Sequence, residues 1–91
     1  MSSVTNQKVT KDWFMYVVEC EDGTYYTGIT TDLYRRLHEH NHSKKGAKYT
    51  RSRRPVGLIY CERHENRSLA SKAEAAFKKL RRVQKEAYIG Y

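Results

Sequence analysis

Five side chains in this sequence have the types that hydrolysis of a phosphodiester bond can use. They are Tyr16, Tyr26, Arg36, His40 and Glu74. The two tyrosines are ten residues apart, the arginine follows ten residues later, and the histidine lies four residues beyond the arginine. Such a reaction needs a positioned nucleophile, neutralisation of charge on the phosphate oxygens, and help for the leaving oxygen.

The chemistry of each side chain matches one of these needs. Arg36 can form a two-pronged hydrogen bond to a phosphate, and His40 shares its helix face because residues four apart on a helix are neighbours. Glu74 offers a lone carboxylate, which suits water-rich Mg²⁺ or Mn²⁺ better than zinc. The phenol of Tyr16 has an ordinary pKa of about 10, so it can act as a general base only where a metal, a cation or a hydrogen bond favours the phenolate.

Each residue also has an ordinary structural interpretation. A tyrosine on a buried strand, such as Tyr16 or Tyr26, more often belongs to the core than to an active site. Arg36 alone would be a solvated helix charge, and Glu74 with Lys78 would be an ion pair between residues four apart on a helix. The functional interpretation therefore depends on the five residues occurring together.

Across about residues 13 to 80 the chain resembles the GIY-YIG endonuclease family, in its small stand-alone branch. The first family motif corresponds to Met15-Tyr16-Val17 and the second to Tyr26-Thr27-Gly28, and both keep the tyrosine. The branch is indicated by Asp22-Gly23 and by Gly46-Ala47-Lys48-Tyr49-Thr50. A literal Tyr88-Ile89-Gly90 follows the last predicted helix, with no strand before it and no Arg-x-x-x-His after it, so we interpret it as a coincidence.

The resemblance implies a metal-dependent endonuclease that acts on DNA, in repair or in the processing of structured DNA. In this family pattern Tyr16 activates a water that attacks phosphorus, with support from Tyr26 and His40. Arg36 would bind the phosphate and Glu74 the metal ion, Mg²⁺ or Mn²⁺. The family usually adds an asparagine in the C-terminal part of the site, where this chain has Gln84 and Glu86.

A cationic segment over residues 43–55 is the best candidate for binding the nucleic acid, and it contains no acidic residue. Its candidate binding residues are Lys44, Lys45, Lys48, Tyr49, Arg51, Arg53 and Arg54. The cations can follow a phosphate backbone while the tyrosine stacks on a base, whereas the ordinary alternative is a solvated flexible loop. The whole chain has a formal net charge of +8 and a pI near 9.7, as expected of a protein that binds DNA, with RNA left open.

The secondary-structure elements that must position these residues can be read from the apolar pattern. The pattern predicts strands over 13–18, 25–30 and 56–61, a turn at Glu21-Asp22-Gly23-Thr24, and helices over about 32–42 and from Ser68 to Leu80. This order predicts an α+β fold, a small three-stranded antiparallel sheet flanked by helices. The first strand is the most apolar, so we expect it to be central.

The rest of the chain sets the expected context. Residues 1–11 are polar and predict a flexible lead-in, so that residues 12–91 form a single nuclease domain. Cys20 and Cys61 predict two buried, reduced thiols. No apolar stretch is long enough for a membrane span or a secretion signal, so the cytoplasm is the expected location and a monomer or weak homodimer the expected state.

Two rival interpretations remain open at this point. The first is a nucleic-acid-binding module of the same fold with little or no catalysis, because a fold alone does not confer activity. The second is a zinc site, for which the available ligands are His38, His40, His42, His64, Cys20 and Cys61. No Cys-x-x-Cys or related spacing joins these residues, which argues against zinc.

Overall fold

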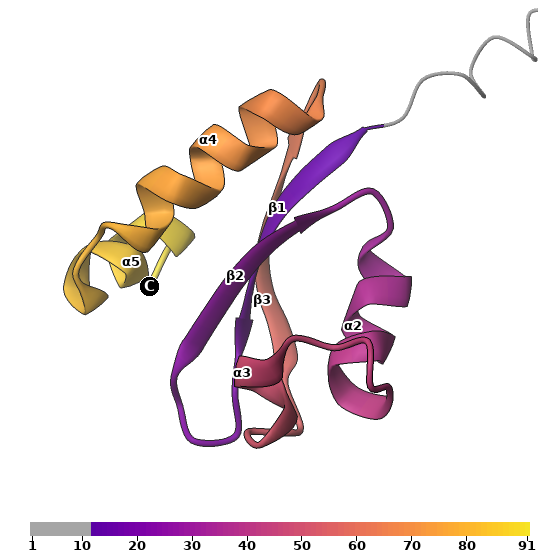
Figure 1. The fold of residues 1–91 in the computed structure, drawn as a ribbon. Helices are drawn as coiled ribbons and strands as arrows, with labels where there is room; N and C mark the ends of the chain where they lie inside the picture. The colour runs from indigo at the N-terminus through magenta and orange to yellow at the C-terminus, as the bar shows by residue number, and fades with distance from the viewer. Residues whose placement is uncertain (1–11) are drawn as a thin grey trace, which may run out of the picture.

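The strands form one antiparallel sheet with the first strand in the centre. The computed structural model describes residues 12–91, and the predicted lead-in over residues 1–11 lies outside the described residues. Strands β1 (Trp13–Glu19), β2 (Tyr25–Thr30) and β3 (Gly57–His64) are arranged in the order β2-β1-β3 (Figure 1). The predicted fold class and the central position of β1 are confirmed.

Strand β1 is central because its apolar run supplies both faces of the sheet. Met15 to Val18 are all buried, and successive side chains of a strand point to opposite faces. Met15 and Val17 pack with Phe77 on one face, while Tyr16 and Val18 pack with Cys20 on the other. The continuous apolar pattern therefore predicted burial on two faces correctly.

The turn between β1 and β2 is built by Asp22 and Gly23. Gly23 has a φ of 84°, which a residue without a Cβ adopts without strain. The Asp22 carboxylate accepts hydrogen bonds from the Thr24 backbone N–H and hydroxyl, at 3.1 and 2.6 Å. This turn sets the register in which Tyr16 lies opposite Gly28.

Helix α2 (Leu33–His42) follows β2 after a short connection. The Asp32 carboxylate caps it by accepting the Arg35 backbone N–H at 3.0 Å, in agreement with the prediction. Leu33 and Leu37 pack against the Tyr16 face of the sheet, and His40 points inward and is buried. A short helix, α3 (Lys48–Arg51), then forms inside the cationic segment that we predicted to be a loop.

Strand β3 runs further than predicted, to His64, and lies at an edge of the sheet. Cys61 pairs with Tyr16 across this strand pair, but it is exposed, whereas Cys20 is buried. The prediction that both thiols are buried is therefore wrong for Cys61, because Cys61 lies on the sheet face of Tyr16, whereas helix α4 (Arg67–Lys78), which packs on β3, covers the opposite face with Phe77.

The C-terminal part of the chain forms two helices. Asn66 caps α4 (Arg67–Lys78) by accepting the Leu69 backbone N–H at 2.9 Å, so this helix begins one residue before the predicted Ser68. Helix α5 (Arg82–Ile89) was not predicted, and it ends at Gly90 in a left-handed conformation. Tyr88-Ile89-Gly90 thus lies at the end of a helix and not in a strand.

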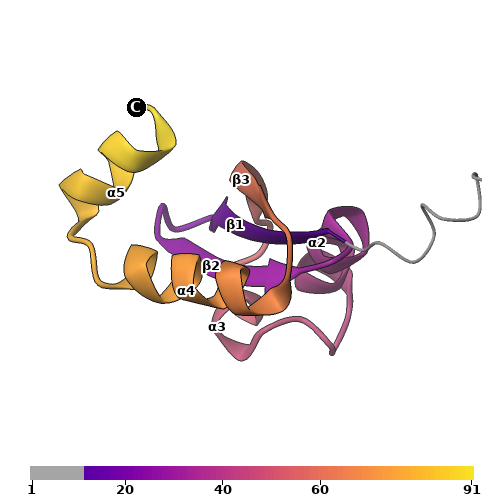
Figure 2. The same ribbon diagram turned by 90° about the horizontal axis from the view of Figure 1, so that it is seen from above.

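The helices lie on two sides of strand β2. Helix α4 packs against β1 and β2, and α2 with α3 lies on the other side of the β2 edge (Figures 1 and 2). No helix in residues 12–91 has the length and apolar character needed to cross a membrane. The edge of β2 between the two sets of helices is where the candidate side chains gather.

Candidate active site

Tyr16 and His40 form the centre of the site. Tyr16 comes from the central strand and His40 from the inward face of α2, and the Tyr16 hydroxyl lies 2.7 Å from His40 Nε2. The Tyr16 residue is 2% exposed and His40 0% exposed. Two of the predicted site residues, 24 positions apart in the sequence, are thus joined by a buried hydrogen bond.

Thr50 binds the other ring nitrogen of His40, and the sequence analysis missed this residue. Its Oγ1 lies 3.0 Å from His40 Nδ1, and its hydroxyl donates to the Ala47 carbonyl at 2.9 Å. The Ala47 backbone N–H also lies 3.4 Å from Nδ1, but the Thr50 contact is shorter. A hydroxyl that donates to a carbonyl is left to accept from Nδ1–H, so the shorter contact favours the tautomer in which Nε2 accepts the Tyr16 proton. Thr50 is wholly buried on α3, a helix that no sequence signal indicated.

Burial decides the protonation of this pair. Burial raises the pKa of Tyr16 to about 12, and the Arg36 guanidinium acts in the opposite direction. Burial also lowers the pKa of His40 to about 4, and the positive charge of Arg36 adds to that effect. Both groups are therefore neutral near pH 7, with Tyr16 donating and His40 accepting.

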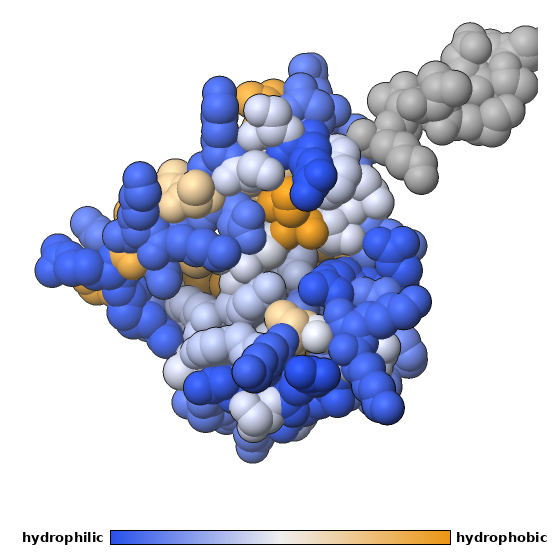
Figure 3. Space-filling model, in the orientation of Figure 1, coloured by the Kyte–Doolittle hydropathy of each residue, from blue (hydrophilic) through white to orange (hydrophobic). Residues whose placement is uncertain are grey.

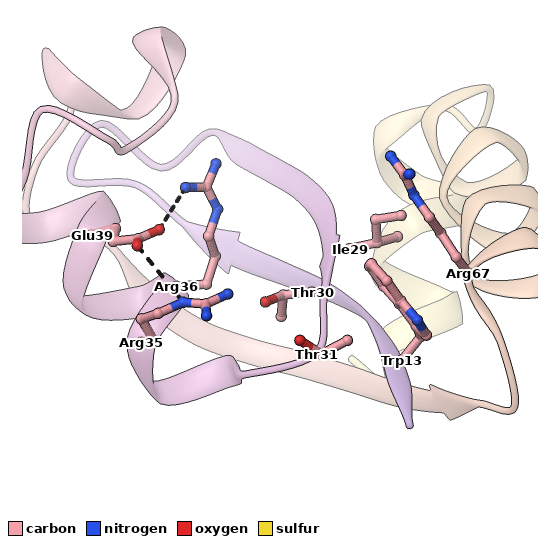
Figure 4. A pocket seen from close by; sticks show the side chains of 8 residues that line it. All are labelled: Trp13, Ile29, Thr30, Thr31, Arg35, Arg36, Glu39 and Arg67. Carbon is pink, nitrogen blue, oxygen red and sulfur yellow. Dashed lines mark hydrogen bonds and ion pairs between the residues drawn. The ribbon is translucent and has the colours of Figure 1, made fainter. Parts of the chain in front are cut away.

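Arg36 lies at the opening of the site, on the same helix as His40. Its Nη1 donates to Glu39 Oε1 at 2.9 Å and to the Lys45 carbonyl at 2.8 Å, and its side chain is 25% exposed (Figure 4). These contacts orient the guanidinium, and its effect on Tyr16 shows that the two groups interact. The part that faces solvent is available to a phosphate.

Glu74 reaches the site from helix α4, on the opposite side of the β2 edge. Its side chain is 22% exposed and forms an ion pair with Lys78 at 3.3 Å. The negative charge of Glu74 contributes to the raised pKa of Tyr16, so the carboxylate is within electrostatic reach of the phenol. The ion pair to Lys78 that the sequence predicted as the ordinary role of Glu74 therefore occurs.

The oxygen donors present fit a hard divalent cation. Residues 12–91 contain no group of three or more His, Cys, Asp or Glu side chains that could hold a metal together. A cation at Glu74 would then take most of its ligands from water and phosphate, which is the coordination that Mg²⁺ favours. The zinc ligands considered above are dispersed instead, since His40 is turned inward while His38 and His42 pair with each other, at 4.9 Å between ring centroids.

Tyr26 and Gly28 from β2 form the wall beside Tyr16. The Tyr26 ring meets His40 edge to face at 5.3 Å and stacks on Tyr49 at 6.0 Å between ring centroids. A Cβ added to Gly28 would lie 2.7 Å from the Tyr16 hydroxyl oxygen, so no side chain fits there. Gly28, which the sequence analysis quoted without a role, is thus required for the position of the phenol.

The cationic segment divides into exposed and structural residues. Lys44, Lys45, Lys48, Tyr49 and Arg51 are exposed. Arg53 stacks on the Tyr49 ring at 3.9 Å and pairs with Asp22 at 3.1 Å. Arg54 donates to the backbone carbonyls of Glu39, His40 and Ser43, so its guanidinium caps the end of α2. We predicted a binding role for Arg54, but these contacts occupy it within the protein.

The two residues considered for the family asparagine lie on α5. Gln84 accepts the Arg81 backbone N–H at 2.8 Å, and Glu86 pairs with Arg82 at 3.1 Å. Both side chains therefore serve helix α5 itself.

On the surface the site is a paler strip between hydrophilic flanks. In the orientation of Figure 1 the space-filling view shows this strip over the β2 edge, with hydrophilic side chains of α4 on one side and of α2 and the cationic segment on the other (Figure 3). The flank on the α2 side includes the cations of residues 43–55, which would attract a polyanion to this strip.

Comparisons with known proteins agree with this arrangement. The model of the GIY-YIG catalytic domain matches residues 12–90. A UPF0213 protein of Enterococcus faecalis is 58% identical over 81 residues, which covers 87% of this chain and 91% of that protein. A UPF0213 protein of Desulfotalea psychrophila is 57% identical over 77 residues, covering 85% of this chain and 70% of that protein.

Two solved structures share the fold. A solution NMR structure of an Enterococcus faecalis protein has a TM-score of 0.61 at 54% identity and covers 87% of this chain and 83% of that one. The solution NMR structure of a UPF0213 protein from Bacillus halodurans has a TM-score of 0.56 at 41% identity, with 86% and 82% covered.

Proposed function

The chain belongs to the GIY-YIG family, and from that premise we propose that residues 12–91 form a metal-dependent endonuclease that hydrolyses phosphodiester bonds in DNA. The observation that carries this proposal is the buried hydrogen bond between Tyr16 and His40, with the charges of Arg36 and Glu74 both acting on the Tyr16 phenol. These side chains come from three different elements, β1, α2 and α4.

In this mechanism Tyr16 takes the proton from the attacking water. His40 accepts the phenol hydrogen bond and so aims the oxygen, while Thr50 holds the imidazole in the tautomer that accepts. The phenol must become phenolate to act as a base, and burial opposes this, since the pKa of Tyr16 is about 12. Arg36 favours the phenolate and also binds the phosphate oxygens.

Glu74 would hold Mg²⁺ or Mn²⁺ beside the phenol. The bound cation supplies positive charge that lowers the pKa of neighbouring oxygen acids and neutralises the charge on the phosphate. Tyr26 packs against His40 and excludes water from the pair. The exposed residues of the cationic segment, Lys44, Lys45, Lys48, Tyr49 and Arg51, bind the DNA on either side of the cut.

The context of the activity is part of the same proposal. We place it in the cytoplasm, in DNA repair or the processing of structured DNA, with the protein as a monomer or weak homodimer. Both cysteines are free thiols, which suits a reducing compartment. One site per protomer favours nicking one strand over a concerted double-strand cut.

The test is cleavage by the wild type and by Glu74→Gln, with Mg²⁺ and with Mn²⁺, on plain, single-stranded, flapped and branched DNA. We expect Glu74→Gln to cut on the order of 100-fold more slowly or worse, because a metal ligand is lost, while it binds DNA as the wild type does. Glu21→Gln makes the same chemical change at an exposed residue of the turn and is expected to cut normally.

The second candidate function is a binding module of the same fold without catalysis. The observation that favours it is the neutral Tyr16–His40 pair, which has no base near pH 7 in the protein alone. Tight DNA binding with no cleavage of any of the four substrates by the wild type would establish this alternative. Cleavage by Glu74→Gln at the wild-type rate would remove the metal role from Glu74.

A further inference from the structure

We propose that a pocket beside the Tyr16 site binds one unpaired nucleotide of the DNA, with the base against Trp13 and the phosphate between Arg35 and Arg67. The inference rests on the proposed function, because it takes the ligand to be the strand that is cut. It goes further in naming the substrate class as DNA with an unpaired nucleotide next to the scissile phosphate.

The pocket lies beside the end of β2, between helix α2 and the start of helix α4. It has a volume of about 300 Å³, and its lining includes Trp13, Ile29, Thr30, Arg35, Arg36 and Arg67. Arg35 and Arg36 stand on the α2 side and Trp13 with Arg67 on the other, across the end of β2 (Figure 4). This volume is at the lower end of the range for small-molecule sites and suits a single nucleotide better than a larger ligand.

The net positive charge of the pocket favours an anionic ligand. Its three arginines face one carboxylate, Glu39, which already pairs with Arg36 at 2.9 Å and with Arg35 at 3.7 Å. The excess is therefore two positive charges. The Arg35 side chain is 58% exposed, so its guanidinium keeps donors for a phosphate, and a guanidinium matches a phosphate with two parallel hydrogen bonds.

The apolar side chains of the pocket favour a nucleobase. Trp13 is half-buried at the start of β1, beside Ile29, and the Arg67 guanidinium lies 5.7 Å from the centroid of its ring. An indole beside arginines is a stacking platform for a nucleobase, and such stacking contributes to binding without regard to sequence. A bare phosphate would need the arginines but not the indole.

The location of the pocket makes the nucleotide an immediate neighbour of the cut. Arg36 lines the pocket and also acts on Tyr16, so the two sites share a residue. On α4, Arg67 and Glu74 are seven residues apart, about two helical turns, and so lie on one helix face. A strand that follows this face passes from the pocket to the site.

An unpaired nucleotide fits where a paired one does not. The faces of a base within a duplex are covered by its neighbours, so a base can stack on Trp13 only when it has left the helix. We therefore expect single-stranded, flapped or gapped DNA to occupy the pocket and an uninterrupted duplex to leave it empty.

The chain contains a single tryptophan, so its fluorescence reports on this pocket directly. The experiment titrates the metal-free protein with a short oligothymidylate, an abasic oligonucleotide of equal length, and a blunt duplex. We expect the oligothymidylate to quench the Trp13 emission and the other two to leave it nearly unchanged. Equal quenching by the abasic strand or by the duplex, or no quenching by any of them, would overturn the proposal.

Variants separate the base from the phosphate. Trp13→Ala should weaken oligothymidylate binding roughly 5- to 150-fold, the usual range for loss of one stacking partner, and Trp13→Phe should retain most of the affinity. Arg67→Gln should weaken the oligothymidylate and the abasic strand alike, while Arg81→Gln, a change of the same charge at the exposed N-cap residue of α5, should weaken neither. Equal effects of Arg67→Gln and Arg81→Gln would count against a phosphate in the pocket.

Failure of this inference and failure of the proposed function look different. A protein that cuts flapped DNA with Mg²⁺ but shows no quenching has the nuclease activity without the nucleotide pocket. A protein that is quenched by oligothymidylate but cuts nothing has the pocket without the activity. An RNA strand that quenches as strongly as DNA supports the pocket and extends its ligand to RNA.

Discussion

His40 shows how one buried side chain can set the chemistry of another. The imidazole has no contact with solvent, and its two nitrogens bind the Tyr16 phenol and the Thr50 hydroxyl. Burial thereby raises the pKa of Tyr16 from 10.0 to about 12 and lowers the pKa of His40 from 6.5 to about 4. In the protein alone the pair is therefore neutral near pH 7.

The first prediction concerns the stability of the protein in acid. The pKa of His40 is lowered to about 4 in the folded protein from 6.5 in the unfolded chain, so between these values the unfolded state binds more protons. The His40 contribution to stability is therefore present above pH 6.5 and is lost as the pH falls toward 4. It amounts to about 3 kcal/mol at most.

Urea unfolding of the wild type and of His40→Gln at pH 7, 6, 5 and 4 measures this contribution. We expect the difference in unfolding free energy between the two proteins to shrink steadily as the pH falls. His38→Gln, at an exposed position of the same helix, is the control and should follow the wild type. A constant difference across the range would mean that His40 does not titrate as described.

The second prediction concerns Gly28, the residue against which the Tyr16 phenol rests. Gly28→Ala would place a methyl group 2.7 Å from the phenol oxygen and 3.0 Å from Cζ, so the ring must move and its bond to His40 must lengthen. We expect cleavage to fall on the order of 100-fold, since small misplacements of a reacting group have effects of that size. DNA affinity should change little.

Gly57→Ala is the matched control for this variant. Gly57 also lies in a strand, and a Cβ added there meets nothing within 4 Å. Single-turnover cleavage rates of the two variants decide the point, with circular dichroism as a check on folding. Similar rates for both would show that the close approach at Gly28 has no part in catalysis.

At the scale of elements, the junction of α2 and α3 positions the site. The guanidinium of Arg54 closes the end of α2 by binding the carbonyls of Glu39 and His40 in its last turn and of Ser43, its C-cap residue. Helix α3 lies beside this end and supplies Thr50 to His40. The cationic segment thus has a structural part and a solvent-facing part.

The third prediction separates these two parts. Arg54→Met should lower the unfolding free energy by about 1–3 kcal/mol, the cost of leaving the partly buried His40 carbonyl without its donor. Arg51→Met, one turn earlier and exposed, should leave stability unchanged and weaken DNA binding. Chemical denaturation and fluorescence anisotropy measure the two effects. A stable Arg54→Met that binds DNA poorly would return Arg54 to the binding surface.

At the scale of the whole molecule, the cationic side chains are distributed over several elements. The formal net charge of +8 could act as a diffuse attraction or through particular contacts. Lys44, Lys45 and Lys48 are exposed at the border of the site, whereas other cations lie on α4 and α5. These two possibilities differ in the salt dependence of DNA binding.

The fourth prediction uses that difference. Replacing Lys44, Lys45 and Lys48 together with Ala lowers the charge from +8 to +5 and should flatten the slope of log K against log salt by about 2.7, at roughly 0.9 per phosphate contact on B-DNA. Replacing Lys72, Lys79 and Arg81 with Ala removes the same charge elsewhere and should flatten it far less. Equal slopes for the two triple variants would favour diffuse attraction.

Much of the fold was determined by local sequence. The apolar run in β1, the Asp-Gly turn and the cap at Asp32 each depend on neighbouring residues, so strands β1 and β2 and helix α2 could be predicted almost to the residue. These elements also determine the face on which Tyr16, Tyr26, Arg36 and His40 lie, because alternation in a strand and the turn of a helix determine which side chains share a face.

Tertiary structure alone decided what each of these side chains touches. Thr50 became the partner of His40, and Arg54 the cap of α2, through contacts between segments ten or more residues apart, which carry no local pattern. Exposure of Cys61 depended on which face of the sheet α4 covers, and α3 formed where composition indicated a loop. The residue types determined which chemistry was available, and long-range packing decided which of the residues were free to perform it.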